Sequence, residues 1–393
     1  MSTRGITLEQ LGQLVERGER LRRLIHQTAL DERPIEAPPI RFGLKEACEL
    51  IGRSASAIRE AETSGKLQAP ELGANGRRIG FTLDAINAAR DHFGTRLRRG
   101  DSDEPVCLAV SNFKGGSSKT TTSVHLAQYL AIRGLRVLLV DADSQGSATQ
   151  TFGYIPDDDI ALENTLHPFL VGNEQDLRYA VRATKWSGLS LIPASLDLYG
   201  AEYALGRGIS QDSRVLNRLR SGIAGIKGDF DVVILDPPPA LGMIALSVMR
   251  AADALLITMP VAAYDLFSTI SYLNMAHQVL ESITQMLGPT DYKFLKLLIT
   301  RLDEASEVQV AMTDVILEHL APFVLPVAVK KTAGLDRAGM RGRSLYEAGP
   351  DDIPPKTLKR GLASFNNANE EILRLLRRCW PSHIEALRAE GIF

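Results

Sequence analysis

The sequence predicts an α/β protein with a doubly wound, mostly parallel sheet, preceded by a small winged helix-turn-helix domain and an N-terminal helix. From Val106 onward, short apolar runs alternate with helical segments, which is typical of a parallel sheet covered on both faces. Before that point lie an amphipathic stretch and then two short helices with a hairpin signal. A length of 393 residues allows two or three domains. The expected domains are residues 1–35, 40–100 and 106–393.

The first domain is expected to be one helix. Its apolar positions follow alternating steps of three and four, at Leu11, Leu14, Gly18, Leu21 and Ile25. Such a helix can pack on its own domain or pair with a second copy, and fewer than three heptads do not decide between the two. The domain assignment takes it as a dimerisation helix.

The second domain is predicted to bind DNA. Leu44–Ile51 and Ser54–Ser64 read as two helices joined by a short turn that contains a glycine, with Ser54 as N-cap. Asn75-Gly76 is a hairpin signal, which places two arginines on a wing. Residues 1–100 hold 17 Lys and Arg against 13 Asp and Glu, although the whole chain has a formal charge of -2. The candidate DNA contacts are Arg53, Ser54, Ser56, Arg59, Arg77 and Arg78.

A candidate phosphate loop follows the first apolar run. Residues 114–121 read K-G-G-S-S-K-T-T, between a strand from Val106 and a helix that ends near Arg133. Glycines let backbone N–H groups close on phosphate oxygens, and the helix adds its positive end. Ser118 stands where G-x-x-x-x-G-K-[ST] has its second glycine. The residues expected to bind nucleotide are Lys114, Gly115, Gly116, Ser117, Ser118, Lys119, Thr120 and Thr121.

Two later strands end in aspartates. Asp141 and Asp143 follow one apolar run, and Asp236 ends another. A single aspartate at a strand end is often a cap or turn residue, but two such strands after a phosphate loop indicate nucleotide chemistry. We therefore expect Lys119 to contact the β- and γ-phosphates, and Thr120 and Asp236 to hold Mg²⁺. The seven expected strands are Val106–Val110, Val137–Val140, Leu189–Pro193, Val232–Leu235, Ala254–Thr258, Phe294–Thr300 and Phe323–Val329.

These motifs resemble the ParA/MinD group of ATPases. Lys114, five residues before Lys119, matches the first lysine of its deviant Walker A motif, and 141–143 matches its D-x-D, with Ser144 replacing a proline. The resemblance implies an ATP-sandwich homodimer in which Lys114 reaches the partner's nucleotide and Asp143 orients the attacking water. Lys114, Lys119 and Asp143 are thus the catalytic candidates.

Within that group the chain resembles type Ia ParA plasmid partition ATPases over nearly its whole length. Residues 331–333, 336–347 and 365–372 are similar to RepA partition proteins of RepABC replicons. The resemblance implies an ATP- and Mg²⁺-dependent, nucleoid-associated partition ATPase. Its hydrolysis is expected to be slow until a ParB- or RepB-type centromere-binding protein stimulates it. The helix-turn-helix would bind an operator for autorepression. Lys356 and Lys359, in a basic C-terminal region, are candidates for non-specific DNA binding.

Other readings of the sequence were weighed against this one. Three scattered cysteines exclude a disulfide framework and an iron–sulfur reductase, and no signal peptide or long apolar segment is evident, so a cytoplasmic protein without a membrane partner is expected. A MinD-like membrane ATPase would need a C-terminal amphipathic helix, but Ile372, Leu375, Leu376 and Cys379 are spaced like a helix packed on its own domain. A transcriptional repressor with nucleotide-regulated DNA binding remains the other alternative.

Overall fold

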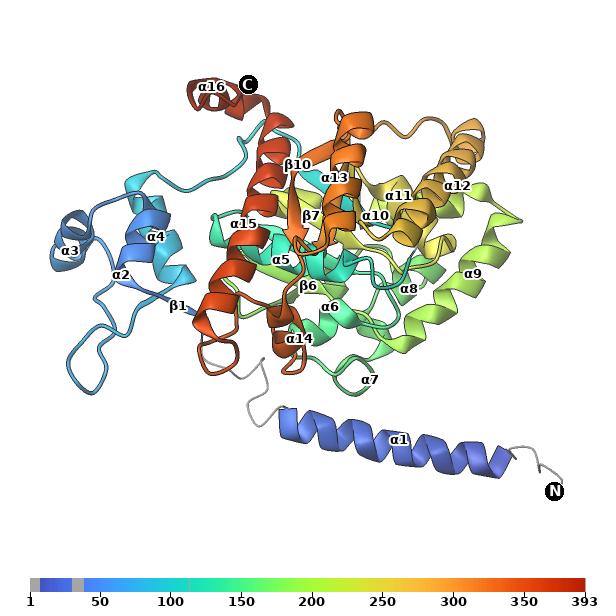
Figure 1. Ribbon diagram of the computed structural model, residues 1–393, viewed down its shortest axis with the longest axis horizontal. Helices are drawn as coiled ribbons and strands as arrows, with labels where there is room; N and C mark the ends of the chain where they lie inside the picture. Colours follow the sequence, from blue (N-terminus) through green and yellow to red (C-terminus); the bar gives the residue numbers. More distant parts are fainter. Residues whose placement is uncertain (1–7, 30–38, 113, 393) are drawn as a thin grey trace.

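The computed structural model describes residues 8–29, 39–112 and 114–392. Its main body is an eight-stranded sheet in the order β10-β9-β8-β3-β7-β4-β6-β5. Neighbouring strands run parallel, except at the edge, where β5 pairs antiparallel with β6. Helices cover both faces of this sheet, and the segment of α2 to α4 lies beside it (Figure 1). The predicted α/β class with a mostly parallel sheet is confirmed.

The strands occupy Arg41–Phe42 (β1), Phe81–Thr82 (β2), Val106–Ser111 (β3), Val137–Asp141 (β4), Arg182–Ala183 (β5), Leu189–Ile192 (β6), Val232–Asp236 (β7), Ala254–Pro260 (β8), Phe294–Leu302 (β9) and Val324–Lys330 (β10). All seven strands expected from the sequence are present. The two-residue edge strand β5 was missed, because so short a segment carries no periodic signal.

The α-helices are α1 (Leu8–Ala29), α2 (Leu44–Ile51), α3 (Ala55–Thr63), α4 (Leu83–Phe93), α5 (Lys119–Ile132), α6 (Ser147–Thr151), α7 (Pro156–Asp159), α8 (His167–Val171), α9 (Tyr199–Ile209), α10 (Arg218–Ile226), α11 (Met243–Ala251), α12 (Ala263–Leu287), α13 (Glu307–Leu320), α14 (Ala333–Gly339), α15 (Pro355–Arg378) and α16 (Ile384–Ala389). Short 3₁₀ helices occupy Leu162–Asn164, Arg178–Ala180, Leu196–Leu198, Ser213–Asn217, Lys227–Asp229 and Pro381–His383.

The central strand β3 separates two hydrophobic cores. Val106, Leu108 and Val110 belong to the core shared with α5 and α15, whereas Cys107 and Ala109 belong to the core on the side of α9, α10 and α11. Side chains alternate between the faces of a strand, so a continuous apolar run is what a strand buried on both faces requires. This explains why β3 has no polar residue before its last position.

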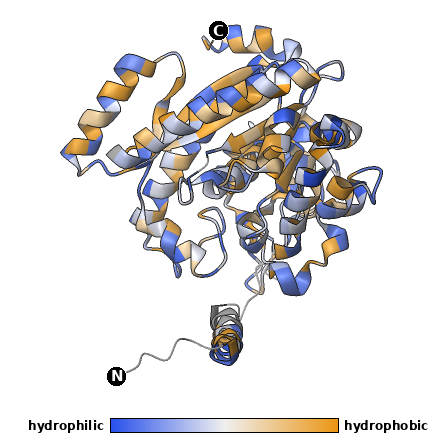
Figure 2. Cartoon of the chain, turned by 90° about the vertical axis from the view of Figure 1, so that its right-hand side faces the viewer, coloured by the Kyte–Doolittle hydropathy of each residue, from blue (hydrophilic) through white to orange (hydrophobic). Residues whose placement is uncertain are grey.

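Figure 2 looks nearly along the axis of helix α1, which lies apart from the rest of the chain in that view. Leu8, Leu14 and Leu24 are 85%, 65% and 57% exposed. The predicted helix is therefore present, and its role in dimerisation stays a prediction. Residues 30–38, which contain the expected boundary at residue 35, lie outside the described residues.

The segment of residues 40–100 has the expected elements. Helices α2 and α3 are joined by a turn in which Gly52 adopts φ 71°, and Ser54 Oγ caps α3 by accepting a hydrogen bond from Ala57 N at 3.3 Å. The hairpin at Asn75-Gly76 is closed by an antiparallel bridge between Leu72 and Arg78. Its DNA-binding role stays a prediction.

Helix α15 packs on the protein's own core. Ile372, Leu373 and Leu376 on this helix, and Trp380 just after it, are at most 1% exposed. They belong to the same core as α5 and β3. The burial of these side chains supports the interpretation of this segment as a packed helix, whereas Leu375 and Cys379 are only partly buried. In the described parts of the chain, no helix is long and apolar enough to cross a membrane.

His125 connects α5 to the C-terminal segment. Its Nδ1 donates to Thr121 O at 2.7 Å, and its Nε2 accepts from Leu345 N at 3.2 Å. Its ring stacks on Phe365 with centroids 4.2 Å apart, and Asn369 Nδ2 donates to His125 O at 3.2 Å. Burial lowers the pKa of His125 to about 4, so the ring is neutral and bridges a donor and an acceptor.

This neutral histidine predicts a loss of stability in acid. In the unfolded chain a histidine has an ordinary pKa near 6.5 and is protonated below that pH. In the native state His125 becomes protonated only near pH 4. The free energy of unfolding should therefore fall as the pH drops from about 6.5 to about 4, by at most about 1.4 kcal/mol per pH unit from this group. Urea unfolding at several pH values should show a shallower dependence for His125→Gln. If His125→Gln had the same pH dependence of stability as the wild type, His125 would not be the group responsible. His92→Gln, which changes an exposed histidine, is the control.

Candidate nucleotide-binding site

The predicted phosphate loop lies where β3 ends and α5 begins. Together with segments that follow β4 and β7, with Arg301 of β9 and with the end of β10 and the segment after it, the loop surrounds a cavity of about 530 Å³. Seven of the eight candidate loop residues line this cavity, from Gly115 to Thr121, together with Asp143. Ligands of doubly wound sheets bind at the carboxyl ends of the strands, and this cavity lies at that edge.

The backbone of the loop accounts for the departure at Ser118. Its φ is 72° and its ψ is 22°, the left-handed conformation in which a glycine would be unstrained. Gly116 in the same loop has φ 74°. Ser118 therefore preserves the conformation that the motif's glycine supplies, at a cost of roughly 1–2 kcal/mol for its Cβ.

Residues from neighbouring strands hold the loop from outside. Thr300 Oγ1 donates to Ser117 O at 3.3 Å, and Arg301 Nη1 donates to Gly116 O at 3.0 Å. Thr258 Oγ1 donates to Ser117 Oγ at 3.3 Å. Two successive loop carbonyls are thus bound by two successive residues of β9. The sequence analysis missed these residues, because only the pairing of distant strands brings them here.

Lys119 is buried at the start of α5, with 6% of its surface exposed. Its Nζ donates to Lys114 O at 3.4 Å. Burial lowers the pKa of Lys119, while the carboxylates of Asp236 and Asp143 oppose that shift. A cation held near two carboxylates and open to the cavity is placed to meet a polyphosphate.

The strand register sets two buried carboxylates side by side. Asp141 on β4 pairs with Asp236 on β7, and both are fully buried. Asp141 Oδ2 accepts from Thr149 N at 2.9 Å and from Thr149 Oγ1 at 2.7 Å. Burial, followed by the charge of Asp236, raises the pKa of Asp141. Asp141 therefore organises the loop after β4 and does not line the cavity.

The carboxylate oxygens of Asp236 have fewer hydrogen-bond partners than those of Asp141. Its Oδ1 accepts from Ser123 Oγ at 3.0 Å, but its buried Oδ2 has no hydrogen-bond partner among the described residues. Burial raises the pKa of Asp236, whereas Thr120, Lys119 and Ser123 act in the opposite direction. A free buried carboxylate oxygen close to a hydroxyl fits a divalent cation.

The chemistry of the donors suits Mg²⁺. Within residues 8–29, 39–112 and 114–392, no group of three His, Cys, Asp or Glu side chains could enclose a metal ion. Mg²⁺ is commonly held by one or two protein oxygens together with waters and substrate phosphates. Thr120 and Asp236 are the residues here that would hold it.

Lys114 differs from Lys119 in its surroundings. It does not line the cavity, and its Nζ forms an ion pair with Asp265 Oδ1 of α12 in the same chain. Its backbone N donates to Asn112 Oδ1 at 3.0 Å. The two lysines of one loop therefore point to different places. Asp265 carried no sequence signal, since it lies 151 residues further along the chain.

Asp143 follows β4 and borders the cavity, with 9% of its surface exposed. Its Oδ1 accepts from Gln145 N at 3.0 Å, which fixes the carboxylate at the turn. Asp143 and Lys119 thus border one cavity, whereas Lys114, the third catalytic candidate, lies outside it, and the catalytic roles of all three stay predictions.

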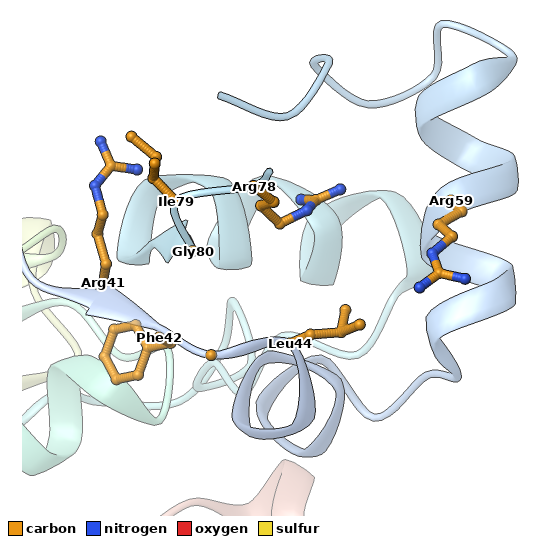
Figure 3. Close-up of a pocket in the computed structure, with 8 residues that line it drawn as sticks. Arg41, Phe42, Leu44, Arg59, Arg78, Ile79 and Gly80 are labelled. Atoms are coloured by element: carbon orange, nitrogen blue, oxygen red, sulfur yellow. The ribbon is translucent and has the colours of Figure 1, made fainter. Parts of the chain in front are cut away.

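The candidate DNA-binding residues lie in several places. Arg59 and Arg78 border one hollow of about 520 Å³, together with Arg41, which the sequence analysis did not single out (Figure 3). Arg78 also forms an ion pair with Glu62 at 2.5 Å. Ser54 and Ser56 are hydrogen-bonded to each other at 2.9 Å.

Of the remaining DNA candidates, Arg53 donates hydrogen bonds to Gly52 O at 3.0 Å and to Phe93 O at 3.4 Å. Arg53 lies over the ring of Phe93, 5.6 Å from its centroid, and Arg77 is exposed on the hairpin. Lys356 and Lys359 are exposed at the start of α15.

Comparison with known proteins identifies the family. A model of an AAA domain family matches residues 106–288. Protein SopA of Escherichia coli is 34% identical over 388 residues, which cover 95% of this chain and 98% of SopA. The chromosome partitioning protein ParA of Myxococcus xanthus is 31% identical, over 64% of this chain and 84% of that protein.

The chain belongs to the ParA family of partition ATPases.

A protein named replication protein A in Rhizobium rhizogenes is 32% identical, over 86% of this chain and 87% of that protein. The expected similarity of this ParA-family chain to RepA proteins is thereby confirmed. A solved structure named Partition Protein superposes with a TM-score of 0.68 over 94% of this chain and 98% of its own, at 18% identity, which supports the fold. Cobyrinic acid a,c-diamide synthase from Mycobacterium smegmatis, solved with an ATP analogue and magnesium, superposes with a TM-score of 0.54 at 27% identity over 69% of this chain and 95% of its own.

The strained loop conformation gives a stability prediction. Ser118→Gly removes the Cβ penalty but adds entropy to the unfolded chain, so the free energy of unfolding should rise by about 0.5–1 kcal/mol. Urea denaturation without nucleotide measures this. Ser117→Gly, next to it and outside the left-handed region, should instead lower stability. A Ser118→Gly protein less stable than the wild type would show that the serine side chain itself stabilises the loop.

Proposed function

We propose that this ATPase binds ATP with Mg²⁺ in the cavity at the phosphate loop, dimerises around the nucleotide and binds DNA in that state. Hydrolysis then releases the DNA, and a ParB-type partner stimulates it, so that a replicon is positioned in the cell. The proposal rests mainly on the different placement of the two loop lysines. Lys119 lines the cavity, whereas Lys114 lies outside it and contacts Asp265. A lysine turned away from its own cavity is suited to serve a second subunit.

The roles of the residues follow from their positions. Lys119, beside Asp236 and Asp143, neutralises the β- and γ-phosphates. Thr120 and Asp236 would hold Mg²⁺, which when bound would screen phosphate charge. Asp143 accepts a hydrogen bond from the attacking water and orients it, with its carboxylate fixed by Gln145 N. Lys114 would have to leave Asp265 to reach the partner's nucleotide, so slow hydrolysis by the isolated chain is expected.

Two separate surfaces are proposed for DNA. The hollow bordered by Arg41, Arg59 and Arg78 would take phosphates of an operator beside the middle of α3, and that binding would repress the protein's own gene (Figure 3). Lys356 and Lys359, exposed on α15, would bind bulk DNA through its phosphates. If both surfaces bind DNA as proposed, the protein is located in the cytoplasm and associated with the nucleoid.

The dimer proposal is tested by complementation. Lys114→Ala should still bind ATP but lose hydrolysis by roughly 10³-fold or more, because a cation supplied in trans is lost from the transition state. Asp143→Ala should bind ATP and lose hydrolysis through unpositioned water. In a mixed dimer of the two, one site has its own Asp143 and receives Lys114 from the other subunit. ATP turnover should therefore reappear on mixing.

Mixed dimers that form but remain inactive would place Lys114 in its own subunit's site. Each variant alone, at the same total concentration, is the control for turnover without exchange of subunits. Co-purification of the two variants carrying different affinity tags, in the presence of ATP, shows that the mixed dimers have formed.

The two DNA surfaces are tested against each other. Arg59→Ala should weaken binding to the DNA upstream of the protein's own coding sequence, with little effect on an unrelated duplex. Lys356→Ala with Lys359→Ala should weaken binding to the unrelated duplex and lower the slope of log affinity against log salt by about 2. Fluorescence anisotropy measures both, and each variant is the control for the other. Equal losses on both DNAs for both variants would contradict two surfaces.

A further inference from the structure

Arg301 has a strained backbone at the edge of the nucleotide cavity. Its φ is 57°, and in the described chain only one other non-glycine residue, Ser118 of the phosphate loop, has a positive φ. A non-glycine side chain rarely adopts this conformation, and residues that do are concentrated at functional sites. Both such residues of the described chain are therefore found at one site.

The strand that carries Arg301 is also irregular. Ile299 pairs with Ala328, but Leu302 pairs with Lys330, so β9 contains one residue more than β10 in this interval. A β-bulge of this kind redirects a side chain, and bulges are frequent next to active sites. The extra residue lies between Ile299 and Leu302, in the interval that holds Thr300 and Arg301, whose side chains bind the two loop carbonyls.

The redirected guanidinium lies against the glycine segment of the loop. Arg301 Nη1 donates to Gly116 O at 3.0 Å, and the side chain borders the nucleotide cavity. Among the described residues no carboxylate pairs with Arg301, which leaves its charge uncompensated beside the loop.

We infer that Arg301 is a positioning residue for the nucleotide: it holds the Gly116 carbonyl, and with it the glycine segment, in the conformation that accepts the phosphates of ATP. This inference rests on the proposed binding of ATP in the cavity. The guanidinium adds a positive charge next to the polyphosphate, and the strain at Arg301 is the consequence of bringing it there. Because the contact is made to the loop and not to the reacting atoms, it should serve binding and leave the chemical step largely unchanged.

Substitutions at this position separate strain from function. Arg301→Gly relieves the backbone and removes the guanidinium, whereas Arg301→Ala keeps the strain and removes the guanidinium. Arg301→Lys keeps both the strain and a cation. Arg214→Ala changes an arginine that is 81% exposed and away from the cavity, and is the matched control.

The experiment measures binding and stability in the full chain. Fluorescent N-methylanthraniloyl-ATP is titrated with Mg²⁺, thermal unfolding is followed without nucleotide, and KM and kcat are determined for ATP. Arg301→Gly should unfold at or above the wild-type temperature, yet bind the nucleotide about 10-fold more weakly, with KM raised and kcat within about 2-fold. Arg301→Ala should unfold at a lower temperature and bind as weakly. Arg301→Lys should recover most of the affinity, and Arg214→Ala should equal the wild type.

Wild-type affinity in Arg301→Gly would overturn the inference, as would a loss of kcat with KM unchanged. An Arg301→Gly protein that loses thermal stability together with affinity would also overturn it, because the arginine would then be a structural support. A wild-type chain that does not bind the nucleotide would instead contradict the proposed function, so the two failures can be told apart.

Discussion

The register of two parallel strands is the constraint on which the rest of the site depends. Pairing of β4 with β7 sets Asp141 beside Asp236, both fully buried, and their charges can be tolerated only with nearby donors and a cation. Thr149 satisfies Asp141 and Ser123 satisfies one oxygen of Asp236. The second oxygen of Asp236 has no partner in the described chain, and Lys119 supplies the nearby positive charge. A sheet that forces carboxylates together thereby creates a place for Mg²⁺ and phosphate.

Two residues adopt strained backbone conformations where the phosphate loop is held in place. Ser118 and Arg301 both adopt left-handed φ values, one within the loop and one on the strand that binds it. Such strain persists only where the surrounding contacts over-determine the backbone. Here Thr300 and Arg301 bind successive loop carbonyls, and the buried helix α5 follows directly. Beyond the loop, His125 joins α5 to Leu345 and Phe365, so packed groups extend from the nucleotide cavity to the helix that carries Lys356 and Lys359.

A site residue could be predicted from the sequence when its signal lies within a few neighbouring residues, and not when its role depends on contacts between distant segments. The loop residues 115–121 and Asp236 have signals within a few residues, namely glycines after a buried strand and an aspartate at the end of another, and the structure brings them to one edge. Asp265, Arg301 and His125 have no local signal, because their roles arise only when distant segments pack together. The edge strand β5 is too short to show a periodic pattern. The left-handed φ of Ser118 could not be predicted, because serine at this position does not indicate that conformation. The functions of Lys114 and the DNA-binding residues remain predictions.

The central claim is that the unpartnered oxygen of Asp236 binds Mg²⁺ together with ATP. Calorimetric titration of ATP into the wild type and Asp236→Asn, each with Mg²⁺ and with EDTA, tests it most directly. The wild type should bind ATP more tightly with Mg²⁺, and the variant, which keeps the shape but loses the charge, should bind equally in both conditions. A variant with the same Mg²⁺ dependence as the wild type, or a wild type without ATP binding, would contradict the account.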